Sequence, residues 1–138
     1  MEMLRKIDKE NNVLTWFEIA VSNTTRAKEF YETILDIEMS TRVFPETNEE
    51  LTFFPYDPNV QQALSGRVTG VLSKSKNRMP SGQGIFVYIN ASPNIQTVLD
   101  KVEKAGGKIV LPKTEAPFGL IAIIIDSEGN RIGLHAAQ

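Results

Sequence analysis

A pattern of one strand followed by one helix occurs twice in this sequence. Residues 14–21 are typical of a strand, and the residues that follow carry apolar side chains at helical spacing, namely Ala27, Phe30, Tyr31 and Ile34. Residues 84–90 again favour a strand, and the same helical spacing returns at Ile95, Val98, Leu99 and Val102. The two copies are offset by about half of the 138-residue chain. The duplication predicts two similar modules, each with a helix on one sheet face and the other face open.

Further strands are predicted after each helix, so each half has the order β-α-β-β-β. We expect one domain over residues 1–138, with module one at about 13–74, a polar linker at about 75–82 and module two at about 83–136. The linker cations, Lys74, Lys76 and Arg78, are expected to be solvated. The predicted fold class is α+β, with two βαβββ modules whose curved mixed sheets enclose a cavity.

Composition excludes several classes of function. The formal net charge is −2 and the basic residues are scattered, so we expect no nucleic-acid partner. No apolar run reaches the roughly 20 residues of a membrane helix, so no membrane association is expected. The chain has no cysteine, and its first residues lack the apolar stretch of a signal peptide. We therefore predict a cytoplasmic protein, and nothing in the sequence indicates a cofactor.

Several short motifs occur in a characteristic order. They are Trp16 to Val21, Arg26-Ala27, Phe30-Tyr31-Glu32, Leu35-Asp36, Ala105-Gly106-Gly107 and Asp126 to His135. In this order they resemble the vicinal oxygen chelate superfamily of glyoxalases, bleomycin-resistance proteins and extradiol dioxygenases. The resemblance covers about residues 14–135. It implies paired βαβββ modules around a cavity, often in a homodimer, whereas the reaction stays open because one fold hosts many chemistries.

Metal-dependent members of that superfamily carry His or Glu ligands at four positions. The resemblance places these positions at Trp16, near Leu72, near Phe86 and at Gly133, none of which can bind a divalent cation through its side chain. Shifting the middle two positions gives Val71, Ser73, Ile85, Val87 or Tyr88, which are no better as ligands. We therefore predict no metal site, which argues against metal-dependent catalysis.

Strand alternation predicts which side chains face the cavity. If Phe17, Ile19 and Val21 pack under the helix, then Trp16 and Glu18 face the opposite side. The same argument places further side chains on the cavity face, namely Phe86, Tyr88, Arg131, Gly133 and His135. With Leu72 these form the predicted ligand-binding set, an aromatic-lined pocket with Glu18, His135 and Arg131 as polar groups.

Three functions remain open from the sequence. The first is a metal-free protein that binds a small organic molecule and forms a homodimer. The second is a lyase or isomerase, either metal-dependent with relocated ligands or an acid–base catalyst that uses Glu18 and His135 as catalytic residues. The third is a non-catalytic interaction domain. Glu18 is equally compatible with a structural ion pair and with a ligand contact, and a lone histidine such as His135 is often structural.

Overall fold

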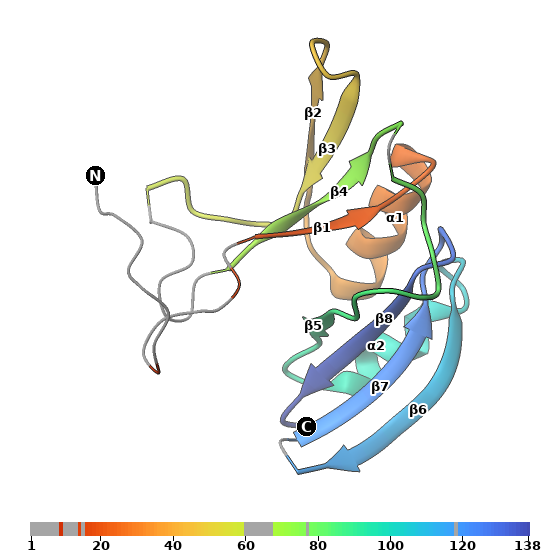
Figure 1. The fold of residues 1–138 in the computed structure, drawn as a ribbon. Coiled ribbons are helices and arrows are strands. Elements are labelled where there is room, and N and C mark those ends of the chain that lie inside the picture. The colour runs from red at the N-terminus through yellow and green to blue at the C-terminus, as the bar shows by residue number, and fades with distance from the viewer. Residues whose placement is uncertain (1–8, 10–13, 15, 60–67, 77, 118) are drawn as a thin grey trace.

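Each half of the chain forms a strand, a helix and three further strands (Figure 1). The computed structural model describes residues 9, 14, 16–59, 68–76, 78–117 and 119–138. Module one contains β1 (Phe17–Ala20), α1 (Thr24–Leu35), β2 (Ser40–Phe44), β3 (Glu49–Phe53) and β4 (Gly70–Lys74). Module two contains β5 (Tyr88–Asn90), α2 (Ile95–Val102), β6 (Lys108–Ala116), β7 (Gly119–Ile125) and β8 (Arg131–Ala136). The predicted β-α-β-β-β order is confirmed in both halves.

The two sheets have the same topology. The strand order is β1-β4-β3-β2 in one and β5-β8-β7-β6 in the other. In each sheet the first strand of the module runs parallel to the last, and the remaining pairs are antiparallel. This mixed arrangement confirms the predicted α+β class. β5 has only three residues, shorter than the strand that the sequence predicts from residue 84.

Both helices begin at an asparagine cap. The Asn23 side chain accepts a hydrogen bond from the Arg26 backbone at 2.9 Å, and the Asn94 side chain does the same for Gln96 at 2.9 Å. α1 ends at Asp36, which adopts the left-handed conformation with φ of 54°. These helices, of 12 and 8 residues, are both too short to span a membrane.

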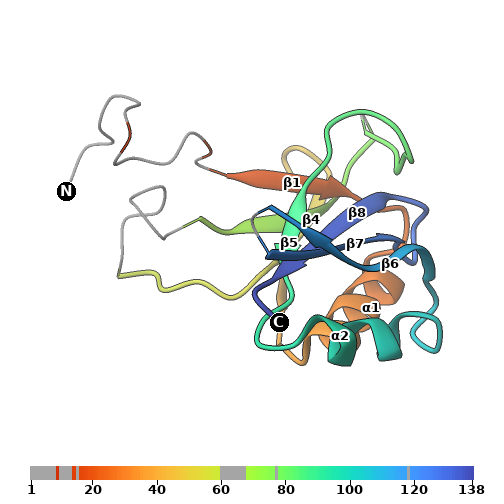
Figure 2. The same cartoon turned by 90° about the horizontal axis from the view of Figure 1, so that it is seen from below.

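The helices lie together on one side of the strands, and the segment that connects the modules lies on the other side (Figure 2). One continuous core joins both modules, because α1 and α2 contact each other as well as their own sheets. Gly107 allows this close packing, since a Cβ there would lie 2.8 Å from the Phe30 ring and 2.6 Å from the Ile125 carbonyl oxygen. The face opposite the helices, which we call the concave face, is not covered by any helix of the described residues.

The Glu128 carboxylate joins module two to the start of α1. It accepts hydrogen bonds from the backbone N–H groups of Ser22 and Asn23, at 2.9 and 2.8 Å, and from Arg26 Nε at 2.6 Å. The Glu128 side chain is fully buried. Burial raises the pKa of Glu128, but the hydrogen bonds from Arg26, Asn23 and Ser22 outweigh that effect and lower its pKa to about 2.

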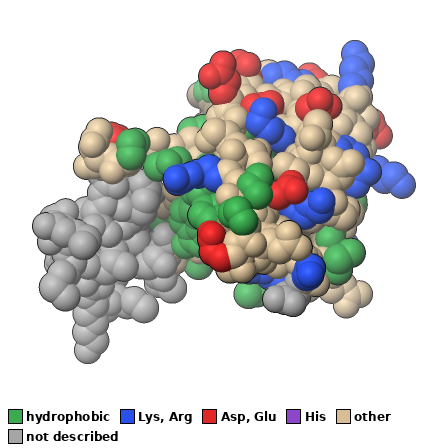
Figure 3. Space-filling view, turned by 90° about the horizontal axis from the view of Figure 1, so that it is seen from above, with side chains coloured by type: hydrophobic (Ala, Val, Ile, Leu, Met, Phe, Trp, Pro, Cys, Tyr) green, Lys and Arg blue, Asp and Glu red, His purple; other side chains and the backbone are tan. Residues whose placement is uncertain are grey.

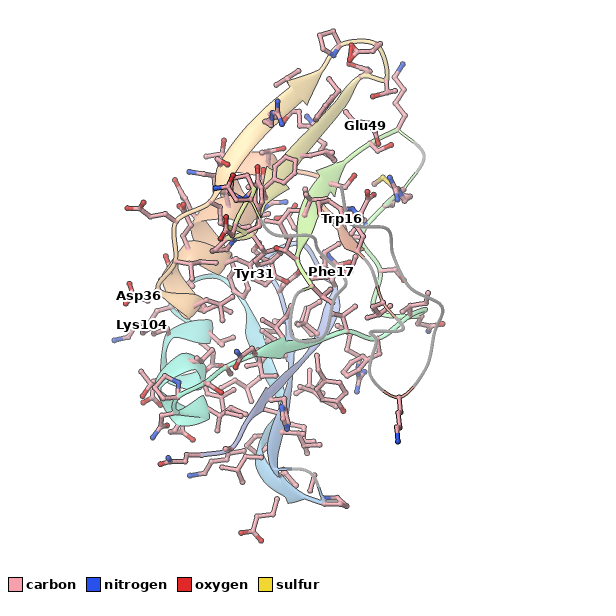
Figure 4. All side chains as sticks on the ribbon, turned by 90° about the vertical axis from the view of Figure 1, so that its left-hand side faces the viewer. Trp16, Phe17, Tyr31, Asp36, Glu49 and Lys104 are labelled. Carbon is pink, nitrogen blue, oxygen red and sulfur yellow. The ribbon has the colours of Figure 1, made fainter. Side chains whose placement is uncertain are left out.

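A second buried contact between the modules lies beside it. The Tyr31 hydroxyl, which extends from α1 toward module two, donates to Asp126 Oδ2 at 2.7 Å (Figure 4). Desolvation of the phenol, together with the charge of Asp126, raises the pKa of Tyr31 well above its usual value. Asn130 then donates from its side chain to the Ala20 carbonyl at 2.7 Å, which ties the start of β8 to the end of β1.

We expect Glu128→Ala to lower the free energy of unfolding by about 2 kcal/mol at pH 7, the scale of hydrogen bonds to a charged group. Because the pKa of Glu128 is lower in the folded state, its contribution is complete above about pH 5 and disappears as the pH falls toward 2. Denaturant unfolding of both proteins from pH 7 to pH 2.5 measures this difference.

The matched control is Glu115→Ala, since Glu115 is an exposed carboxylate on β6 of the same module. We expect it to change stability by less than about 0.5 kcal/mol at any of these pH values. A constant difference between wild type and Glu128→Ala across the pH range would contradict the proposed charge contribution.

Candidate functional site

The strand register decides which residues of module one lie on the concave face. Ile19 pairs with Leu72, and both are buried in the core on the helix side. Directly paired residues point to the same face, so Glu18 with Val71 and Ala20 with Ser73 lie on the concave face. The expectation that Leu72 faces the cavity is therefore wrong by one residue, and Val71 takes that place.

The register of module two agrees with the predicted alternation. Ile89 pairs with Leu134 in the core, whereas Tyr88 pairs with Gly133 on the opposite face. Arg131 and His135 lie on the same face as Gly133, because they are two residues away along β8. Tyr88, Arg131, Gly133 and His135 therefore lie on the face that the sequence predicts for them.

Gly133 lies beneath two aromatic rings. Phe86 and Tyr88 pack edge to face with ring centroids 5.1 Å apart. A Cβ at position 133 would lie 2.5 Å from Tyr88 Cδ1 and 2.8 Å from Phe86 Cε2, so only glycine leaves room for the rings. Phe86 is nevertheless 37% exposed and Tyr88 50% exposed. The pair thus presents a rigid aromatic surface on the open face.

A second aromatic group lies in module one. Trp16, which directly precedes β1 (Figure 4), packs edge to face on Phe53 at 6.1 Å, and Phe53 contacts Tyr56 at 5.7 Å. On the side of the molecule seen in Figure 3, hydrophobic side chains gather near the middle, with acidic and basic side chains around them. Exposed aromatic surface is therefore present in both modules.

Glu18 is already engaged by its neighbours. Its carboxylate accepts a hydrogen bond from Trp16 Nε1 at 3.2 Å and forms an ion pair with Arg78 at 2.6 Å. Arg78 also pairs with Glu49 at 3.4 Å. Sequence reasoning missed this role of Arg78, which was expected to be solvated, because nothing in the local pattern shows which carboxylate the connecting segment approaches.

His135 lies at the opposite end of β8 from Arg131, about 13 Å along the strand at the usual rise per residue. Its Nε2 atom is close to Gly119, where a Cβ would lie 3.0 Å away. Glu18 instead lines a pocket with Arg131. The structure therefore does not bring together the two residues that acid–base catalysis was predicted to use.

A pocket of about 410 Å³ lies where the two modules meet beneath the connecting segment, and we call it the junction pocket. The connecting segment covers it with Arg78, Met79, Ser81, Gln83 and Ile85. Its walls come from both sheets, namely Glu18, Ile19, Ala20, Ser73, Val87, Asn130, Arg131 and Ile132. The Ser73 hydroxyl is buried and has no hydrogen-bond partner among the described residues. No local sequence pattern indicates this unpaired hydroxyl, since serine in a strand is common.

A larger cavity, of about 800 Å³, opens between the ends of α1, β3 and β5. Most of its lining is apolar and comes from the helix side of the strands, including Phe17, Leu35, Ile37, Phe54 and Val87. Of the predicted ligand-binding residues only Tyr88 lines it. Thr69, Asn90 and Ser92 add polar groups to it, but none of its described lining residues is charged, whereas the junction pocket contains Glu18, Arg78 and Arg131.

The side chains at the resemblance-based ligand positions do not suit a divalent cation. On the concave face these positions hold Trp16, Val71, Gly133 and one or both of Phe86 and Tyr88, which supply neither imidazole nor carboxylate. In the described part of the chain no three histidine, cysteine, aspartate or glutamate residues group together as metal ligands. We therefore derive no reaction step through a metal.

Comparison with known proteins places this fold in a family. A family model described as the Glyoxalase/Bleomycin resistance protein/Dioxygenase superfamily matches residues 13–134. A search of curated proteins finds no match.

Solved structures with the same fold are distant in sequence. A glyoxylase/bleomycin resistance protein/dioxygenase domain from Frankia sp. EAN1pec is 16% identical with a TM-score of 0.65, covering 91% of this chain and 97% of that one. A hypothetical protein from S. aureus is 17% identical with a TM-score of 0.59, covering 90% and 93%. A mutant of glyoxalase I from Zea mays is 17% identical with a TM-score of 0.65, covering 90% of this chain and only 46% of its own. Identities this low establish the fold alone.

Proposed function

The chain belongs to the glyoxalase/bleomycin resistance protein/dioxygenase superfamily, and on this basis we propose that it binds a small organic molecule on its concave face without a bound metal. The observation that carries this proposal is the exposed pair of Phe86 and Tyr88 above Gly133. Exposure of large aromatic side chains to water is unfavourable in free energy, so an exposed pair of this kind is a typical contact surface for a ligand.

The arrangement of polar groups supports binding more than acid–base catalysis. A carboxylate that acts as a general base must be free to take a proton from its substrate. Glu18 is held by Trp16 and Arg78, and His135 does not share its pocket. A lyase or isomerase that uses these two residues is therefore the weaker alternative.

We further propose a homodimer in which the second copy borders the concave face. The edge strands are β1 and β2 in one sheet and β5 and β6 in the other. Exposed apolar residues, such as Ile85 at 96%, lie beside them. Association of two copies would cover both features. A cytoplasmic location stays a prediction from composition.

We expect the purified protein to hold less than about 0.1 equivalent of zinc, nickel, iron or manganese per chain after dialysis, since the concave face lacks the ligands that retain these ions. Elemental analysis measures this directly. One equivalent that survives dialysis would contradict the metal-free proposal.

The binding proposal is tested with N-phenyl-1-naphthylamine, a neutral aromatic probe whose fluorescence rises in apolar surroundings. We expect Phe86→Ala to weaken its binding by about tenfold, because removal of one ring of an aromatic contact costs on the order of 1–1.5 kcal/mol. Fluorescence titration gives the dissociation constants, and thermal melts establish that the variant is folded.

The matched control is Val43→Ala, since Val43 is 65% exposed and lies on the other face of its sheet. It should leave the affinity within about twofold, which corresponds to about 0.4 kcal/mol. If wild type does not bind the probe, or if Phe86→Ala binds it equally well, the concave face is not the ligand site and the non-catalytic interaction domain becomes the better reading.

We expect sedimentation equilibrium at 10–50 μM, the micromolar range where specific dimers assemble, to give about twice the chain mass. Ile85 is apolar and almost fully exposed in the isolated chain. The substitution Ile85→Glu should shift the protein toward monomer, because it introduces charge repulsion between the two copies. A monomer for wild type throughout this range would rule out the dimer.

A further inference from the structure

The junction pocket contains one cation without a counter-charge. Its charged side chains are Glu18, Arg78 and Arg131. Glu18 and Arg78 neutralise each other at 2.6 Å, and Arg78 has Glu49 as a second partner. Arg131 is exposed, and none of the described carboxylates forms an ion pair with it. The pocket therefore offers a free guanidinium, a group that pairs with planar anions through two parallel hydrogen bonds.

The wall of the same pocket holds an unsatisfied hydroxyl. Ser73 is fully buried, and its Oγ atom has no hydrogen-bond partner among the described residues. The register with Ala20 places Ser73 on the concave side, where the pocket lies. Buried hydroxyl groups in folded proteins nearly always have a partner, so an orphan in a pocket wall indicates a group that the protein alone does not supply.

The aromatic pair lies next to this pocket. Arg131 and Gly133 are on the same face of β8, two residues apart, which is about 6.7 Å along a strand. Phe86 and Tyr88 cover Gly133, and their neighbours Ile85 and Val87 line the pocket. A flat ring against the aromatic pair would thus place a substituent within reach of the Arg131 guanidinium.

A second cation reinforces the field on this side. Arg131 pairs across the sheet with Ile125, and Ile125 pairs with Lys108, so the two cations share one row and one face. Lys108 also has no ion pair with a described residue. Two unpaired cations on one face, separated by a single strand, raise the local concentration of anions and favour their binding.

We propose that the natural ligand is an aromatic organic acid, whose ring packs on Phe86 and Tyr88 and whose anionic group enters the junction pocket to pair with Arg131. This inference rests on the proposed function, because it assigns the chemical class of the ligand bound at the same concave face. Arg131 is a specificity-determining residue in this arrangement, since it selects acids over neutral aromatic compounds of the same shape.

The test compares two probes that differ by one anionic group. 8-Anilino-1-naphthalenesulfonate and N-phenyl-1-naphthylamine have the same aromatic framework. Only the first carries a sulfonate group, so only the first is charged. We expect Arg131→Gln to weaken binding of the sulfonate probe by about tenfold or more, the effect of losing a charged hydrogen-bonded pair. The neutral probe should keep its affinity within about twofold. Arg131→Lys, which retains the charge but not the paired donors, should fall between wild type and Arg131→Gln.

The control for net charge is Lys101→Gln on α2, which removes one positive charge on the helix side of the sheets. It should leave the affinity for both probes unchanged. Equal loss of both probes in Arg131→Gln, or no loss of the sulfonate probe, would overturn the assignment of Arg131 as the anion partner.

The two proposals fail in different ways. Failure of the neutral probe to bind wild type, or to respond to Phe86→Ala, rejects the concave binding site itself. If the neutral probe binds normally and the affinity for the sulfonate probe does not change in Arg131→Gln, only the proposal that the ligand is an acid is rejected. Thermal melts of each variant exclude loss of folding as the cause.

Discussion

The hydrogen bonds of one buried carboxylate set the relation between the two modules. Glu128 comes from the β7–β8 loop of module two, yet all of its partners in module one lie at the start of α1, at Ser22, Asn23 and Arg26. Asn130 then holds the start of β8 against the end of β1. The junction pocket lies between these same strands, so its width depends on Asn130 and Ala20, which line it, and also on Glu128, which does not. Substitutions far from any ligand are therefore able to change the site.

Because the two modules share one core on the helix side of their sheets, the concave face lies on the outside of that core. Because α1 and α2 pack together, the helix sides of both sheets are buried against a common interior. Among the described residues, the segment that connects the modules lies over part of the opposite faces, and no helix covers them (Figure 2). Aromatic residues on that side remain exposed for a topological reason, and this exposure is what makes them available to a ligand or a second copy.

The sequence predicted the fold well because duplication and alternation are local signals. Strand alternation placed Trp16 and Glu18 correctly, and it also placed the residues of β8, since side chains alternate regularly along an unbroken strand. Leu72, which the resemblance and not alternation placed on the cavity face, is wrong by one residue, because the register of β4 depends on its pairing with β1 and β3, which the local pattern does not reveal. The partners of Arg78 and the lack of a partner for the Ser73 hydroxyl could not be predicted from the sequence either, because both depend on segments that are far apart in the sequence.

The missing side chain at Gly133 has a consequence for metal binding at this position. A metal ligand at that position needs a Cβ and further atoms, but the rings of Phe86 and Tyr88 already fill that volume. The ring pair and a side-chain ligand at position 133 are therefore mutually exclusive states of one backbone. A side-chain ligand at position 133 would therefore require Phe86 and Tyr88 to move or to be replaced at the same time.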